Sequence, residues 1–453
     1  MRVRQSWLRR ALATPAAAWG ATGGAAPRAA SGVILLLLLS LLLAVGAAAQ
    51  SIHVPARVTQ PVDVQKLVRL GGNTHPLARP EFDRGAAPDS LPMERMLLVL
   101  QRSADQEAAL RRLLDDQQVK SSPSYHRWLK PGEFGEQFGP ADADVQAVTG
   151  WLTSQGFEVK RVAAGRTVIE FSGTAGLVRQ ALHTEIHKYA VNGEEHWANA
   201  NDPAIPAALA PVVAGVASLY NFPRRPLYRR LGAFSRNKAT GQVRPLFTFN
   251  GGSGDLFGLG PADFATIYNV QPLWQAGTDG TGQTIAIVAQ TNINLQDVRD
   301  FRTMFGLPAN DPKIVLNGPD PGITDPNNEG ESDLDAEWAG GVAKNATIDL
   351  VVSESTESSL GVDLSALYIV DNNLAPVVSV SYGFCEAVVG NAGNAYYNAL
   401  WEEAAAQGMT VLVAAGDSGS AVCDESSFEN AATQGLAVSG LASTPFNVAV
   451  GGT

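Results

Sequence analysis

Short apolar runs alternate with amphipathic stretches between Leu91 and Pro223. Met96–Leu100 is a continuous apolar run that predicts a buried strand, and Asp105–Leu114 has apolar residues at helical spacing. The same criteria predict two further helices and a pair of strands, namely Asp142–Gln155, Gly173–His183, Glu158–Val162 and Thr167–Phe171. Because strands, helices and a hairpin alternate in this way, residues 91–223 are expected to form a compact α+β domain of the split βαβ, ferredoxin-like type.

Residues 258–453 show a second pattern. Short runs that are apolar on both faces alternate with helical segments, which is typical of a parallel sheet covered on both sides. The predicted strands are Thr284–Ala289, Ile348–Val352, Val377–Ser381 and Thr410–Ala415, and the predicted helices include Leu295–Met304 and Asn394–Gln407. Active residues gather at the carboxyl ends of the strands in such sheets, so an α/β fold with a site at one sheet edge is expected.

The remaining segments read as signals and connections. Arginines precede the apolar run Val33–Val45, and Ala47–Ala49 follows it, which predicts a secretory signal over residues 1–49. The chain is then extracytoplasmic, with no stable membrane insertion after cleavage. An uncleaved anchor is the alternative, although the run is shorter than the ~20 residues that span a bilayer. Residues 50–90 are interpreted as an N-terminal extension and residues 224–257 as an exposed basic linker open to proteolysis.

Charge is distributed unevenly along the chain. Residues 258–453 contain four basic and 24 acidic residues, a net charge of −20, so the first 257 residues carry +9 of the overall −11. So acidic a half does not favour binding to nucleic acid, which needs clustered lysine and arginine. All six histidines lie within the first 196 residues. Chemistry in the second half therefore has to proceed without histidine.

Acidic residues are the candidates for that chemistry. Glu331 and Asp335 would share one face of a helix at i and i+4, and two close carboxyls share a proton. The alternative is that acids collect in a first helical turn to complement the helix dipole. Asp417 follows a buried strand in a tight turn, where a capping role is the alternative. Gly416–Gly419 matches the nucleophile turn of trypsin-like proteases only superficially, because those enzymes need a histidine base and two β-barrels.

Two further features lie between these acids. Val377–Val380 runs out into Ser381, Tyr382 and Gly383, and such a strand end can receive a peptide through main-chain hydrogen bonds. Cys385 and Cys423 are the only cysteines. In an oxidising space they can pair in a single way, whereas the alternative is two isolated buried thiols.

In order and spacing, these elements resemble the sedolisin family of acid-acting serine-carboxyl peptidases. Four segments of the second half carry the resemblance: Gly330–Asp335, Ser379–Gly383, Ala414–Gly419 and Val448–Thr453. Three more, Ser122–Leu129, Phe134–Pro140 and Asp144–Val145, resemble the activation domain of kumamolisin-type members. The resemblance implies an α/β subtilisin-like sheet, incomplete here, behind a propeptide that acts as an intramolecular inhibitor. From the opposite net charges of the two halves, we expect that propeptide to be held partly by charge.

The resemblance also implies roles for single residues. Glu331 would be the general base, Asp335 the acid that orients it, and Asp417 the protonated donor that completes the oxyanion hole. Ser379, Ser381, Tyr382 and Gly383 would bind protein or peptide substrates, and Tyr382 falls where kumamolisin-like members tend to carry tryptophan. Gln290 occupies a place where some members have another carboxylate.

The family nucleophile and the calcium ligands are expected beyond residue 453. A Ser-Gly-Thr-Ser-type turn would lie roughly a hundred residues after Asp417, whereas the sequence ends 36 residues after it. The expected function is a secreted endopeptidase zymogen whose present segment is inactive alone. The alternatives are a non-catalytic secreted inhibitor or peptide-binding fragment, and a histidine-based hydrolase whose histidine lies further on.

Overall fold

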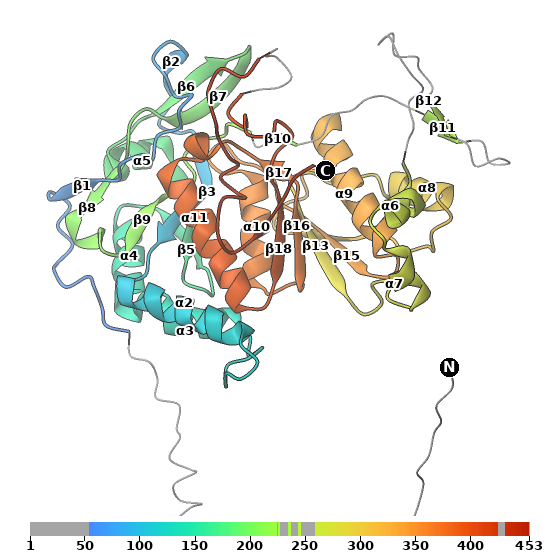
Figure 1. Ribbon diagram of the computed structural model, residues 1–453. Coiled ribbons are helices and arrows are strands. Elements are labelled where there is room, and N and C mark those ends of the chain that lie inside the picture. Colours follow the sequence, from blue (N-terminus) through green and yellow to red (C-terminus); the bar gives the residue numbers. More distant parts are fainter. Residues whose placement is uncertain are drawn as a thin grey trace, which may run out of the picture. The chain divides into compact units, whose positions relative to one another are not determined.

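The computed structural model describes residues 54–223, 225–226, 234–236, 243–245, 259–424 and 431–452. The expected signal (1–49) and most of the expected linker (224–257) lie outside these residues. Six strands form a parallel sheet in the order β14-β15-β13-β16-β18-β19 (Figure 1). Their bounds are β13 Thr284–Ala289, β14 Lys313–Leu316, β15 Thr347–Val352, β16 Val377–Val380, β18 Thr410–Ala414 and β19 Val448–Val450.

Helices cover both faces of this sheet. Along β13, Ala286 and Val288 pack into a core shared with α10 (Gly361–Asp371) and α11 (Glu386–Ala406). Ile287 and Ala289 face the other way, into a core shared with α8 (Leu295–Met304) and α9 (Pro326–Val342). Successive side chains of a strand point to opposite faces, so a doubly covered strand has to be apolar throughout. The mixed α/β fold with a parallel sheet is thus confirmed.

The N-terminal region contains an antiparallel sheet in the order β4-β5-β3-β9. Its strands and helices are β3 Pro92–Leu100, β4 Glu158–Val162, β5 Val168–Thr174, β9 Val213–Val216, α2 Ala104–Gln118, α3 Pro131–Phe138, α4 Asp142–Ser154 and α5 Ala175–Leu182. Met96 and Leu98 of β3 pack against α4 and α5, whereas Leu97 and Val99 join the core that contains Trp401 of α11. One apolar core therefore runs from this sheet into the α/β half.

Smaller elements complete the described chain. They are β1 Leu67–Arg69, β2 Asp83–Ala86, β6 Ile186–Val191, β7 Glu194–Asn199, β8 Ala204–Pro206, the 3₁₀ helix η1 Ala207–Leu209, β10 Arg225–Pro226, β11 Phe234–Arg236, β12 Val243–Pro245, α6 Pro261–Ile267, α7 Gln271–Gln275 and β17 Tyr382–Gly383. Within the described residues, no helix combines the length and apolar character needed to cross a membrane.

Candidate active site

Four candidate residues come together at the carboxyl edge of the parallel sheet. Glu331 and Asp335 lie on α9, Ser381 directly follows β16, and Asp417 follows β18. Ser381 donates a hydrogen bond to Asp335, and the Asp417 carboxylate is close enough to Glu331 to raise its pKa. The structure thus gathers groups that the sequence separates by up to 86 residues.

Helix α9 begins earlier than the sequence pattern indicated. Asp325 is its N-cap and accepts hydrogen bonds from the main-chain N–H groups of Asn327 and Asn328, and Pro326 occupies the first turn. Glu331 and Asp335 therefore lie in the second and third turns. The alternative that they complement the dipole from a first helical turn is wrong for these two residues, because that effect is confined to the helix end.

Burial shapes the electrostatics of this pair. Glu331 is 2% exposed, and burial, then Asp335 and Asp417, raise its pKa to about 9 against a hydrogen bond with Ser381 that lowers it. Burial raises the pKa of Asp335 to about 7, again opposed by Ser381. No cation is among the causes of either shift. The two carboxyls consequently titrate as a coupled pair that retains a proton near neutrality.

The substrate-binding candidates divide between side-chain and main-chain roles. Ser379 and Ser381 are partly buried, and Ser381 turns its hydroxyl to Asp335. Tyr382 is fully buried in the core between the sheet and α10–α11, and burial keeps the pKa of its phenol raised. Tyr382 and Gly383 instead present main chain, because β17 pairs antiparallel with β10. Sequence patterns gave no sign of this pairing.

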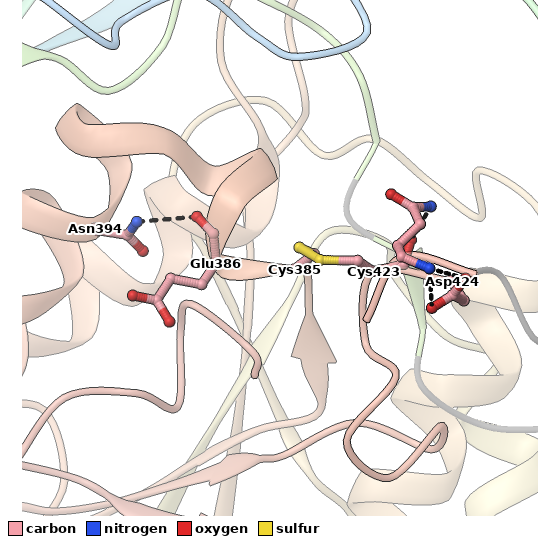
Figure 2. The surroundings of a disulfide bond; sticks show 6 residues. Cys385, Glu386, Asn394, Cys423 and Asp424 are labelled. Carbon is pink, nitrogen blue, oxygen red and sulfur yellow. Dashed lines mark hydrogen bonds between the residues drawn. A yellow bond between two sulfur atoms is a disulfide. The ribbon is translucent and has the colours of Figure 1, made fainter. Parts of the chain in front are cut away.

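A disulfide anchors the segment that carries Asp417. Cys385, the N-cap of α11, is bonded to Cys423, with 4.8 Å between their Cα atoms (Figure 2). Asp424 next to it accepts main-chain hydrogen bonds from Thr433 and Gln434. The strand end at β17 and the turn after β18 are thereby linked covalently. Asp417 itself is exposed, and partial burial raises its pKa.

Gln290 is linked to α9 one turn before the carboxyl pair. It is 6% exposed at the end of β13, and its Nε2 donates to Asn328 Oδ1 at 2.9 Å. The side chain of Asn328 in turn donates to Asp325, the N-cap. Gln290 therefore supports the start of α9.

Sequence reasoning missed a second acidic group on the other side of α9. Asp297, Glu329 and Asp333 hold carboxylate oxygens within 4.8 Å of one another, which is the arrangement that a metal ion can use. Burial, then Asp297 and Glu329, raise the pKa of Asp333 to about 7. The spacing of Glu329 and Asp333 at i and i+4 was visible in the sequence, but the approach of Asp297 from α8 was not.

The chain is similar to known proteins in both of its halves. Residues 82–222 match the family model of the pro-kumamolisin activation domain. Sedolisin of Pseudomonas sp. (strain 101) is 30% identical over 379 residues, covering 82% of this chain and 62% of that protein. Kumamolisin of Bacillus sp. (strain MN-32) is 28% identical over 395 residues, covering 85% of this chain and 66% of that protein.

A solved structure of Pseudomonas sedolisin, a serine-carboxyl proteinase complexed with two molecules of pseudo-iodotyrostatin, is 31% identical in the aligned part. It covers 44% of this chain and 55% of that chain, with a TM-score of 0.37. The chain spans less than two thirds of the length of the curated relatives named above. The activation domain and these relatives together show that the chain belongs to the sedolisin family.

Proposed function

We propose that the chain is the precursor segment of a secreted, acid-acting serine-carboxyl endopeptidase. Glu331 is the general base, Asp335 orients it, and protonated Asp417 donates to the developing oxyanion. The observation that carries the proposal is the buried pair Glu331 and Asp335, with Asp417 beside it, at the carboxyl edge of a parallel sheet in a histidine-free half. Such a pair supplies the proton transfers that histidine supplies in other serine peptidases.

The proposed reaction is the attack of a serine hydroxyl on the peptide bond, followed by departure of the leaving nitrogen. The nucleophile implied by the resemblance is the hydroxyl of a serine in a Ser-Gly-Thr-Ser-type turn, and residues 1–453 contain no such turn. The hydroxyl oxygen bonds to the substrate carbonyl carbon while its proton passes to one oxygen of Glu331, and the proton already on Glu331 passes to the ionised carboxylate of Asp335. The carbonyl oxygen gains negative charge opposite Asp417. Glu331 then returns the proton to the leaving nitrogen as the peptide bond breaks. The segment ending at Thr453 is accordingly inactive alone.

The pairing of β10 with β17 supports both the substrate class and the inhibition. Arg225 lies opposite Gly383 and Pro226 opposite Tyr382 in antiparallel register, and β10 also contacts α9. Addition of a strand to an exposed edge is a common way for a protein to bind an extended peptide. The chain's own linker thus occupies the edge that a substrate would use, as expected of an intramolecular inhibitor.

Finer assignments belong to the same proposal. The strand orders support a subtilisin-like sheet in the second half and a ferredoxin-like domain in the N-terminal region. The Cys385–Cys423 disulfide suits an oxidising, extracytoplasmic location. The calcium site suggested by the resemblance has its ligands beyond Thr453, and calcium takes no part in the steps above.

Self-processing tests the proposal. The protein translated from the complete reading frame is shifted from pH 7 to pH 4, and the new N-terminus is identified by mass spectrometry. Cleavage within residues 224–257 is expected in the wild type and in Glu386→Gln, whose side chain is exposed at the start of α11, but not in Glu331→Gln. The same cleavage in Glu331→Gln would contradict the assigned base. Sustained turnover by the chain ending at Thr453 would contradict the missing nucleophile.

A further inference from the structure

We propose that Ser381 is a positioning residue of the carboxyl pair, whose hydroxyl favours ionisation of Asp335 through a direct hydrogen bond. This inference rests on the proposed function, since it assigns a role within the same site. It differs from the role expected from the sequence, in which Ser381 binds substrate.

Strand alternation determines where the Ser381 side chain points. Val378 and Val380 of β16 belong to the core on the α10–α11 side of the sheet. Ser379 and Ser381 alternate with them and therefore face α9. The Ser381 Oγ donates to Asp335 Oδ1 at 2.6 Å, a length typical of a hydroxyl bound to a carboxylate.

Hydrogen-bond donors are otherwise scarce around the pair. Among the described residues, Asp335 Oδ2 and Glu331 Oε2 are buried without a hydrogen-bond partner. The other titratable groups that face the pair are Asp417 after β18 and Tyr382 of β17, and neither is a cation. Within the described residues the Tyr382 hydroxyl is buried without a hydrogen-bond partner, so it donates to neither carboxyl. Ser381 opposes the rise in the pKa of both carboxyls, whereas Asp417 raises only that of Glu331, so the hydrogen bond and the neighbouring charge together favour ionisation of Asp335 first.

The titration order agrees with the geometry. Burial raises the pKa of both carboxyls, but the pKa of Asp335 stays near 7 while that of Glu331 reaches about 9. Asp335 is thus the first to ionise. Glu331 keeps its proton on the oxygen that faces Asp335. When its other oxygen accepts the proton of the nucleophile, Glu331 passes its first proton to Asp335, so the number of protons is conserved.

Carbon-13 NMR of the intact chain, labelled at aspartate Cγ, tests this role. The Asp335 signal is assigned by its loss in Asp335→Asn. Removing the donor in Ser381→Ala should raise the pKa of Asp335 by about one to two units, because a hydrogen bond to a charged group is lost. Ser381→Thr keeps a hydroxyl and should titrate as the wild type does. Ser379→Ala removes a hydroxyl from the same face of the same strand and should leave the Asp335 titration unchanged.

An unchanged Asp335 titration in folded Ser381→Ala would overturn the inference, as would an equal shift in Ser379→Ala. If Ser381→Ala does not fold, Ser381→Cys replaces the hydroxyl by a weak donor, and it too should raise the Asp335 pKa. A wild-type titration in Ser381→Cys then overturns the proposal. The measurement needs no turnover, so its failure leaves the proposed peptidase function standing. If Glu331→Gln still cleaves its linker, the proposed peptidase function is contradicted, whereas the titration of Asp335 in the wild type is unaffected by that result.

Discussion

At the scale of single residues, Glu331 and Asp335 are held in a place that disfavours their charged forms. Their pKa values of about 9 and about 7 lie above the unfolded values near 4. Between those limits the folded chain binds more protons than the unfolded chain, so folding stability falls as pH rises. The pair therefore costs stability at neutral pH, as active-site groups commonly do.

Replacement of one acid by its amide tests this cost. Asp335→Asn cannot ionise, so it should be more stable than the wild type at pH 8, by on the order of 4 kcal/mol, and equally stable at pH 3. Thermal unfolding at both pH values measures the difference, with Asp300→Asn, an exposed acid of α8, as the control. If the difference in unfolding temperature between Asp335→Asn and the wild type is the same at both pH values, the proposed cost of burying a charged Asp335 is contradicted.

The sequence predicted these residues only in part. The spacing of Glu331 and Asp335 placed them on one helix face, and the exit of a buried strand placed Asp417 at a sheet edge. The contact of Ser381 with Asp335 depends on which strand lies under α9. That order is set by packing between segments 46 residues apart, which a local pattern does not encode.

At the scale of elements, the strands followed the pattern more closely than the helix ends did. β13 and β4 have the bounds that the sequence predicted. In contrast, α11 consists of two helical segments joined across a kink at Gly390, whose φ of +71° is not helical, and the helix expected from Asn394 lies in the second segment. Glycine adopts this left-handed conformation without steric cost, and a glycine at this position of the sequence suggests a break in the helix.

The disulfide contributes to stability at this scale. Cys385 and Cys423 close a loop with a sequence separation of 38, and cross-linking such a loop stabilises a fold by about 3 to 4 kcal/mol. Cys385→Ser should therefore unfold several degrees below the wild type in an oxidising buffer. Reductant should lower the unfolding temperature of the wild type to that of the variant and leave the unfolding temperature of the variant unchanged. Equal unfolding temperatures without reductant would exclude a stabilising role.

At the scale of the whole described chain, the N-terminal region and the α/β half share an apolar core and a few buried polar contacts. Arg161 pairs with Asp371 of α10, and Arg102 pairs with Glu402 of α11. Glu403 is 1% exposed and accepts hydrogen bonds from Thr167 and Gln407. Charge contributes to this contact, as the sequence suggested, but the continuous core indicates that apolar burial also holds the two parts together.

Glu403 gives this contact a defined pH dependence. Burial, then Asp371, raises its pKa to about 8 in the joined state, against Thr167, Arg102 and Gln407, which lower it. Once the N-terminal region leaves, water reaches the carboxyl and its pKa returns toward the usual value near 4. Association therefore takes up a proton, so it weakens as pH rises, by up to tenfold per unit between about pH 5 and 8.

Retention of the N-terminal region measures this effect. In a Glu331→Gln precursor nicked in the linker by an added protease, size-exclusion chromatography should show more of the region retained at pH 5 than at pH 8. Glu403→Gln should reduce that difference, whereas Glu386→Gln should preserve it. A difference of the same size in the Glu403→Gln background would show that other groups carry the proton.

The central claim is that Glu331 performs the proton transfers of a serine-carboxyl peptidase. The most direct measurement is kcat/KM on a peptide substrate at pH 4 for the processed protein from the complete reading frame. For Glu331→Gln the processed form is obtained by cutting the linker with the added protease. We expect a loss of at least about 10²-fold in Glu331→Gln and wild-type activity in Glu386→Gln. Wild-type activity in Glu331→Gln would contradict the account.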